Sequence, residues 1–162
     1  MAEKSSAYKE AVKYKGFFSY TDLYNFCYNW FKEEGYNLKE EVYTEKLSGF
    51  GKEVLIEWKA TKKISDYYKN IIEVKWHILG MNDAEVEVEG KKQKTNKGEV
   101  KISVSADLER DYEENWDKTP MWKFLRGIYD KYIMRTTQDE YEDRLTKKAV
   151  SFVEDLKAFL NL

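Results

Sequence analysis

Several residue types are scarce in this chain of 162 residues, which has one cysteine, Cys27, one histidine, His77, and one proline, Pro120. A lone cysteine cannot form an internal disulfide, and zinc sites need several converging ligands, so we expect neither disulfide nor metal. There is no apolar run near 18 residues, so we expect no membrane span. The N-terminal stretch lacks the apolar core and cleavage site of a signal peptide, so we expect a cytoplasmic protein.

Arginine is also scarce, with four among 28 basic residues, and 30 acidic residues bring the net charge to −2. Nucleic-acid-binding proteins usually carry a basic excess and use arginine for bidentate contacts, so we expect at most weak, salt-sensitive binding of nucleic acid. One cluster of lysines could touch phosphates or an acidic partner, or could protect a strand edge. Its members are Lys91, Lys92, Lys94 and Lys97.

Residues that could carry catalysis are few. His77 lies on the charged face of a predicted strand, and the sequence identifies no acid or nucleophile beside it. Cys27 lies on the apolar face of a predicted helix, where a small core residue is expected. There is no glycine-rich phosphate loop. We therefore expect a protein that is not an enzyme and needs no cofactor; a cyclase-type enzyme is a further hypothesis that would require a buried acid–base pair.

The apolar residues that are present follow regular periods and predict a single domain over residues 1–162. Residues 8–18 alternate as a first strand. Residues 20–34 place apolar side chains on one helical face, with Ser19 and Asp22 as an approximate capping box and Gly35 as the C-terminal cap.

Five more segments alternate between apolar and polar residues, which predicts an antiparallel sheet with one packed face. Tyr36, Leu38 and Val42 are assigned to one face of the first of these segments. Turns are predicted at "SGFGK", at "MND" (81–83) and at "TNKG" (95–98). With residues 8–18, the sheet has about six strands; the five added segments are 36–47, 53–61, 68–79, 84–94 and 99–109.

The stretch "TPMWKFLRGIYDKYIMR" at 119–135 mixes aromatic and basic side chains. Such a mixture is found in nucleic-acid grooves, in membrane-surface helices and in helices that pack on a sheet. On a helix the aromatic and basic residues separate onto opposite sides, which argues against a groove that stacks bases. We expect residues 121–133 to cover the sheet with Trp122, Leu125 and Tyr129 inside, and the apolar stripe then continues to the C-terminus.

The predicted order is α+β and resembles the helix-grip fold: one strand, one helix, five strands and a long C-terminal helix. That superfamily includes START lipid-transfer domains, pollen-allergen-like proteins, polyketide cyclases and co-chaperones. The resemblance covers nearly the whole chain and lies in element order alone. Family members usually have two short helices after the first strand, whereas this chain has one, at 20–34. The resemblance implies an apolar ligand cavity between the sheet and the C-terminal helix.

The aromatic content, with five tryptophans and thirteen tyrosines, is high. Such residues line ligand pockets, although a tightly packed aromatic core would use them too. The leading hypothesis is a non-enzymatic module that binds an apolar or aromatic small molecule through Trp58, Trp76, Trp122, Leu125 and Tyr129. The alternative is a protein-interaction module, in the manner of a co-chaperone, that uses the outer sheet face. Its residues would be Tyr43, Leu47, Leu55, Ile71 and Leu79.

Overall fold

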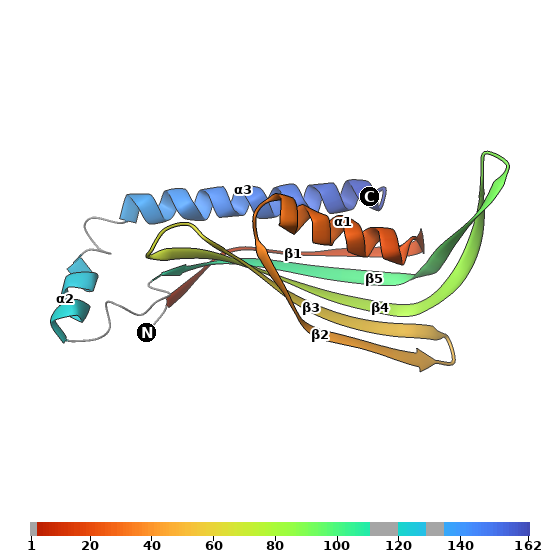
Figure 1. Cartoon of the computed structure of the whole chain (residues 1–162), viewed down its shortest axis with the longest axis horizontal. Helices are drawn as coiled ribbons and strands as arrows, with labels where there is room; N and C mark the ends of the chain where they lie inside the picture. The colour runs from red at the N-terminus through yellow and green to blue at the C-terminus, as the bar shows by residue number, and fades with distance from the viewer. Residues whose placement is uncertain (1–2, 111–119, 129–134) are drawn as a thin grey trace.

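The computed structural model describes residues 3–110, 120–128 and 135–162, which form an antiparallel sheet with two helices on one face and a short helix beyond its end (Figure 1). The sheet has five strands in the order β1-β5-β4-β3-β2, and every neighbouring pair is antiparallel. The elements are β1 (Glu3–Phe18), α1 (Tyr20–Glu33), β2 (Asn37–Ser48), β3 (Gly51–Lys63), β4 (Tyr68–Val88), β5 (Lys91–Arg110), α2 (Pro120–Ile128) and α3 (Arg135–Phe159).

The first helix, α1, matches its sequence prediction. The Ser19 hydroxyl accepts a hydrogen bond from the backbone N–H of Asp22 and so caps the helix. Gly35, at φ +81°, follows the helix in the left-handed region that glycine adopts without cost. The helix buries one face against the sheet and α3, which confirms the predicted apolar stripe. The buried residues of this face are Leu23, Cys27, Trp30 and Phe31.

The sheet has five strands where six were predicted, because residues 84–94 are not a strand of their own. They contain the hairpin turn between β4 and β5, at Glu89 (φ 53°) and Gly90 (φ 79°). Two consecutive residues with positive φ are typical of the tight turn that fits the twist of a hairpin. The segments 81–83 and 95–98, predicted as turns, lie instead within β4 and β5. Only the turn at "SGFGK" is where the sequence placed it.

A bulge in β2 reverses the faces that were assigned to its second half. The pairing with β3 shifts between Glu40 and Val42, so Val42 lies opposite Glu57 and Tyr43 opposite Ile56. An extra residue in one strand moves every later side chain to the other face. The assignment of Val42 to the face of Tyr36 was therefore wrong. Tyr43 lies on the helix side of the sheet, where its hydroxyl is 2.8 Å from that of Tyr20 at the start of α1.

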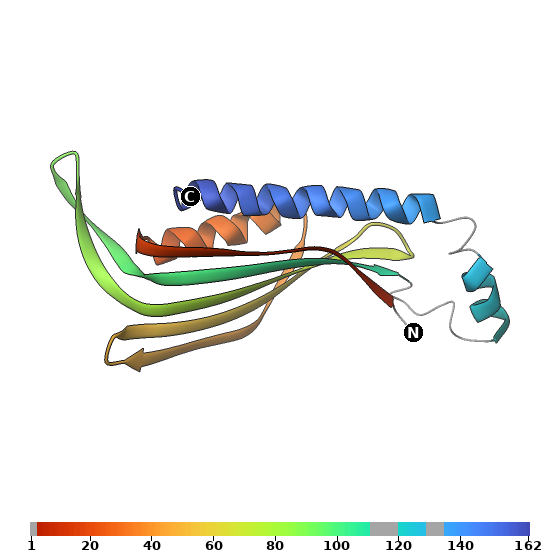
Figure 2. The ribbon, with the colours of Figure 1, turned by 180° about the vertical axis from the view of Figure 1, so that it is seen from behind.

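The C-terminal helix α3 packs against the sheet, as the sequence predicted. Figures 1 and 2 show α3 and α1 side by side on the same face. Trp30 of α1 stacks obliquely on Phe152 of α3 at 4.9 Å between ring centroids, and its indole N–H donates to Asp155. α3 and Leu160, the residue after it, bury one stripe completely or almost so; its members in α3 are Leu145, Ala149, Phe152, Val153 and Leu156.

The described C-terminal helix that covers the sheet is α3; residues 121–128, which were predicted to cover it, do not, and residues 129–133 of that prediction lie outside the described residues. α2 ends at Ile128 and lies beyond the end of the sheet (Figure 1), and Leu125 is 39% exposed, so its predicted burial was wrong. The side chain of Trp122 and all of Tyr129 lie outside the described residues. Of the helices that the structure describes, none combines the length and the apolar character that crossing a membrane requires.

Candidate binding site

Four glycines line up across four neighbouring strands. Gly16 of β1 pairs directly with Gly98 of β5. A β-carbon on Gly98 would lie 3.0 Å from the Cα of Met81 in β4. A β-carbon on Gly51 of β3 would lie 2.8 Å from the carbonyl carbon of Gly80 in β4. At Gly51 and Gly98 the backbones approach so closely that no larger side chain fits without a shift of the chain.

The sheet bends at the glycine row. The pairing of β4 with β5 shifts between Leu79 and Asn82, and Gly80 takes φ +61° within this bulge. Bulges and glycines are the usual means by which a sheet turns sharply. β1 ends at Phe18, which pairs with Asn96, and beyond this pair β4 and β5 continue as a two-stranded ribbon that curls toward the helix side of the sheet (Figures 1 and 2). We call residues 82–97 the hairpin arm.

The hairpin arm carries opposite charges on its two strands. Glu85 pairs with Lys94, and Glu87 pairs with Lys92, so acidic and basic side chains face each other across the ribbon. Such cross-strand pairs stabilise a ribbon modestly. Asn96 connects the arm to the start of α1: its side-chain oxygen accepts from the Tyr20 N–H at 2.9 Å, and its amide donates to Asp83. All four clustered lysines pair within the arm, and two of them, Lys92 and Lys94, lie opposite glutamates.

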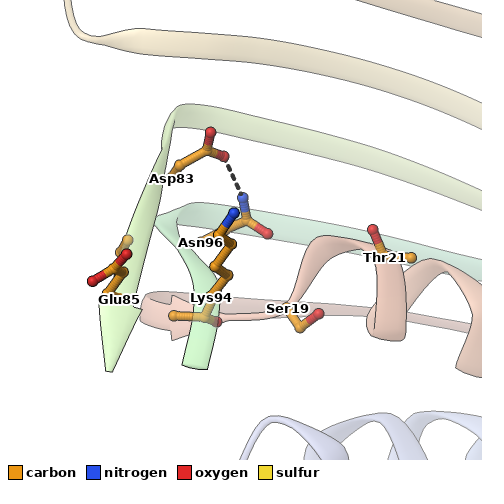
Figure 3. A pocket seen from close by; sticks show the side chains of 8 residues that line it. Ser19, Thr21, Asp83, Glu85, Lys94 and Asn96 are labelled. Carbon is orange, nitrogen blue, oxygen red and sulfur yellow. Dashed lines mark hydrogen bonds between the residues drawn. The ribbon is translucent and has the colours of Figure 1, made fainter. Parts of the chain in front are cut away.

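A polar cleft of about 530 Å³ lies between the arm and the start of α1 (Figure 3). Figure 3 shows Asp83 and Asn96 directed toward each other, with Ser19 and Thr21 on the helix side. Ser19 already caps α1 and Asn96 already binds both Tyr20 and Asp83, so several polar groups in this cleft have partners within the protein. The lining residues are Ser19, Thr21, Asp83, Ala84, Glu85, Lys94, Thr95 and Asn96.

A second cleft, of about 590 Å³, lies at the bend, and we call it the bend cleft. It is lined partly by Leu79 and by the backbones of Gly16, Gly80 and Gly98. Leu79 pairs with Glu99, and its neighbours Ile78 and Val100 are buried on the helix side, so this cleft opens on the opposite face. The remaining lining residues are Lys15, Ser48, Phe50, Asn82, Asp83, Ala84, Lys97 and Glu99.

The bend cleft combines exposed apolar side chains with charged residues. Phe50 is 88% exposed and Leu79 is 43% exposed. The Asn82 amide donates to the carbonyls of Phe50 and Gly80, at 3.0 and 3.2 Å, which fixes the β2–β3 turn against the bulge. Lys15 and Lys97 supply positive charge among the lining residues. A volume of this size, apolar surface and a few charged groups are typical of small-molecule sites.

The two tryptophans singled out from the sequence lie together in the core beneath α1. Trp58 is 2% and Trp76 is 1% exposed, and their rings are 5.1 Å apart, which confirms the predicted inward face. The ring of Tyr24 lies 5.0 Å from that of Trp58, edge to face. The Trp58 indole and the Tyr24 hydroxyl both donate to one oxygen of Glu40, at 3.1 and 2.8 Å. Leu125 does not join this group, since α2 lies beyond the end of the sheet (Figure 1).

Tyr24, Tyr43 and Cys27 favour their neutral forms. Burial, together with the hydrogen bond to Glu40, raises the pKa of Tyr24 to about 12. Burial, together with the bond to Glu45, also raises the pKa of Tyr43. Burial raises the pKa of the Cys27 thiol, so Cys27 stays protonated and is a poor nucleophile.

His77 lies on the outer sheet face at 3.0 Å from a carboxylate oxygen of Glu53, and its side chain is 42% exposed. Within the described ranges, no three histidine, cysteine or acidic side chains converge as metal ligands.

The residues predicted for a protein-interaction surface do not form one patch. Leu55 and Leu79 are exposed on the outer face, but Ile71 is buried and Tyr43 lies on the helix side. Leu47 is 84% exposed, near the β2–β3 turn. Of this set, only Leu79 lines the bend cleft.

Sequence reasoning missed the main features of the bend cleft, Phe50 and the glycine row. Two signals for them were present. Gly80 and Gly98 interrupt or border alternating segments, and a glycine inside a strand often marks a bulge or a close approach of two backbones. Phe50 stands between two glycines in a turn, where a large apolar residue has no core to enter.

No family model matches the chain, and no curated protein matches it. Among solved structures, an uncharacterised protein from Rhizobium leguminosarum matches over 99% of this chain and 98% of its own. The identity is 9% and the TM-score is 0.25, and a similarity of that size carries no argument about fold or function.

Proposed function

We propose that the protein is a non-enzymatic binding module and that an apolar or aromatic small molecule binds in its bend cleft. The observation that carries the proposal is the exposure of Phe50 and Leu79 beside a cleft of about 590 Å³ with backbone in its wall. Glycine backbones let a planar ligand approach closely, and apolar contacts supply most of the affinity in such sites. Lys15 and Lys97 can pair with an acidic group on the ligand, but Asp83 and Glu99 line the same cleft and balance its charge.

The position between the sheet and α3, where the sequence suggested a ligand, is less well supported. Phe152 and Leu156 of α3 are fully buried, as are Ile102 and Ala106 of β5. Side chains that are already packed leave a ligand no room unless they move. Trp58 and Trp76 are candidates for ligand contact only if α1 moves, because Tyr24 packs on both rings.

We also propose a relationship to the helix-grip superfamily, in which apolar ligands are common. The order of one strand, one helix, a run of antiparallel strands and a long helix packed on the sheet supports this relationship. The single helix after β1 is a departure from the usual pattern. A cytoplasmic location is consistent with the proposal, since the one cysteine is free and buried.

Titration with the dye 1-anilinonaphthalene-8-sulfonate (ANS), an aromatic anion, tests the proposed site. We expect the native protein to enhance the dye's fluorescence and Leu79→Ser to weaken binding about tenfold, because a buried leucine side chain contributes about 1.5 kcal/mol or more. Leu55→Ser is the matched control, since Leu55 is similarly exposed on the same face, at 38%, but does not line the cleft. Equal affinities for the two variants, or no binding by the native protein, would refute the proposed site.

A protein partner is a second candidate, and one observation favours it. Leu47 and Phe50, near the β2–β3 turn, are both more than 80% exposed, which is more than a small ligand needs. Affinity capture with the native protein and with Phe50→Ser would test this. A partner captured by the native protein and lost in the variant supports it, and identical capture by both refutes it.

A further inference from the structure

The short helix α2 presents an apolar stripe to solvent. Met121, Phe124, Leu125 and Ile128 are spaced at i, i+3, i+4 and i+7, so they lie on one side of the helix. They are 68%, 67%, 39% and 38% exposed. Lys123, which this spacing places on the other side, is exposed as well.

This exposed stripe distinguishes α2 from the other two helices. α1 and α3 each bury their main apolar stripe, with Leu23 of α1 and Leu145 of α3 fully covered, although Tyr28, Val150 and Phe159 are still 36–38% exposed. α2 lies beyond the sheet, at the end opposite the hairpin arm (Figures 1 and 2). An amphipathic helix that leaves its apolar side in water has a surface suited to a partner.

The charge of α2 is opposite to that of the rest of the chain. Its sequence, PMWKFLRGI, contains Lys123 and Arg126 and no acidic residue, a charge of +2. The whole chain has a net charge of −2, so the other residues sum to −4. An anionic surface attracts the two basic residues of α2. This attraction is local to the helix, because −3 of the −4 on the other residues lies in residues 111–119, directly before it.

We propose that α2 docks on an anionic lipid surface, with its apolar stripe in the interfacial layer and its axis parallel to the bilayer. Basic residues beside an apolar stripe are the usual features of helices that bind in this way. A nucleic acid could stack a base on Phe124 but would leave the aliphatic side chains of the stripe in water. A protein groove is less suitable, because four side chains cover at most about 500 Å², whereas each partner in a standard protein interface buries about 800 Å². This proposal is independent of the bend cleft.

Flotation with lipid vesicles tests the proposal on the full chain. We expect the protein to float with vesicles of phosphatidylcholine and phosphatidylserine, at least about tenfold more than with phosphatidylcholine alone, and less at high salt. Met121→Asp/Phe124→Asp should abolish flotation, and Lys123→Glu should reduce it. Phe50→Asp is the control, since Phe50 is the more exposed residue but lies near the opposite end of the sheet, and it should float like the native protein.

Three results would overturn the proposal. The first is the absence of flotation with phosphatidylserine vesicles. The second is flotation that Met121→Asp/Phe124→Asp does not change. The third is a large fall in the thermal midpoint of that double variant, since exposed side chains contribute little to folding and such a fall would show that the stripe packs within the protein.

Discussion

Substitution of Gly51 by alanine tests whether close backbone packing produces the bend. A β-carbon at this position would lie 2.8 Å from both the carbonyl carbon of Gly80 and the carbonyl oxygen of Met81. Carbon atoms pack favourably at about 3.5–4.0 Å, so the β-carbon would overlap both backbone atoms. Neither atom can retreat freely, because Met81 is paired with Lys52 in the ladder between β3 and β4.

The expected cost of Gly51→Ala has two parts. Gly51 has φ +126°, a region that residues other than glycine adopt only with strain of about 1–3 kcal/mol. Overpacking against fixed atoms adds about 1–3 kcal/mol. We therefore expect the free energy of unfolding to fall by about 2–5 kcal/mol, measured by urea denaturation with fluorescence detection.

Substitutions at two other glycines allow the cost of backbone strain to be measured apart from the cost of overpacking. Gly90 has φ +79° but no atom within 4 Å of the point that a β-carbon would occupy, so Gly90→Ala should show strain alone, about 1–2 kcal/mol. Gly49 has neither positive φ nor a close neighbour, so Gly49→Ala should change stability by less than about 0.5 kcal/mol. If Gly51→Ala costs no more than Gly90→Ala, the glycine row is not closely packed and this explanation of the bend is wrong.

Three further predictions concern the core and the arm. Trp58→Ala and Trp76→Ala should each lower the free energy of unfolding by about 3–5 kcal/mol. Trp76→Phe should lower it less than Trp58→Phe does, because the Trp58 indole donates a hydrogen bond to Glu40. Among the described residues, the buried Trp76 indole has no acceptor to lose. The pKa of Tyr24 is raised from 10.0 to about 12 on folding, so neutral Tyr24 stabilises the fold below pH 10 and this contribution is lost as the pH rises through 12. Between pH 10 and 12, the urea midpoint should therefore fall less in Tyr24→Phe than in the native protein. An equal fall in both proteins would contradict this prediction. Asn96→Ala should expose the Tyr20 amide to faster hydrogen exchange, and unchanged protection would show that the arm is not held there.

The sequence correctly predicted the elements in which apolar residues recur at a regular spacing because one face of the element is buried. Leu23, Cys27 and Phe31 lie on one face of a helix of 3.6 residues per turn, and no other structure buries them together. Trp58 and Trp76 alternate with charged residues, so only one face of each strand could be inside.

The features that sequence reasoning missed depend on single insertions and on tertiary packing. One extra residue at Glu41 reverses the faces of β2, and no local pattern marks it. The segments "TNKG" (95–98) and "EG" (89–90) both contain residues that suit turns, so the sequence does not tell which of them closes the hairpin. In the structure the hairpin closes at Glu89 and Gly90, whereas Gly98 lies within a strand beside Met81. Leu125 fits a buried stripe as well as an exposed one, and only the position of α2 distinguishes the two.

The most direct test of the proposed binding function is where a bound aromatic ligand lies. Amide chemical shifts from ¹H–¹⁵N NMR spectra of the full chain, recorded during titration with ANS, would map the site. We predict that the largest changes occur at Phe50, Leu79, Gly80 and Gly98, around the bend cleft. Largest changes at Phe152 and Leu156, or changes spread evenly over the chain, would contradict the account and place the ligand elsewhere.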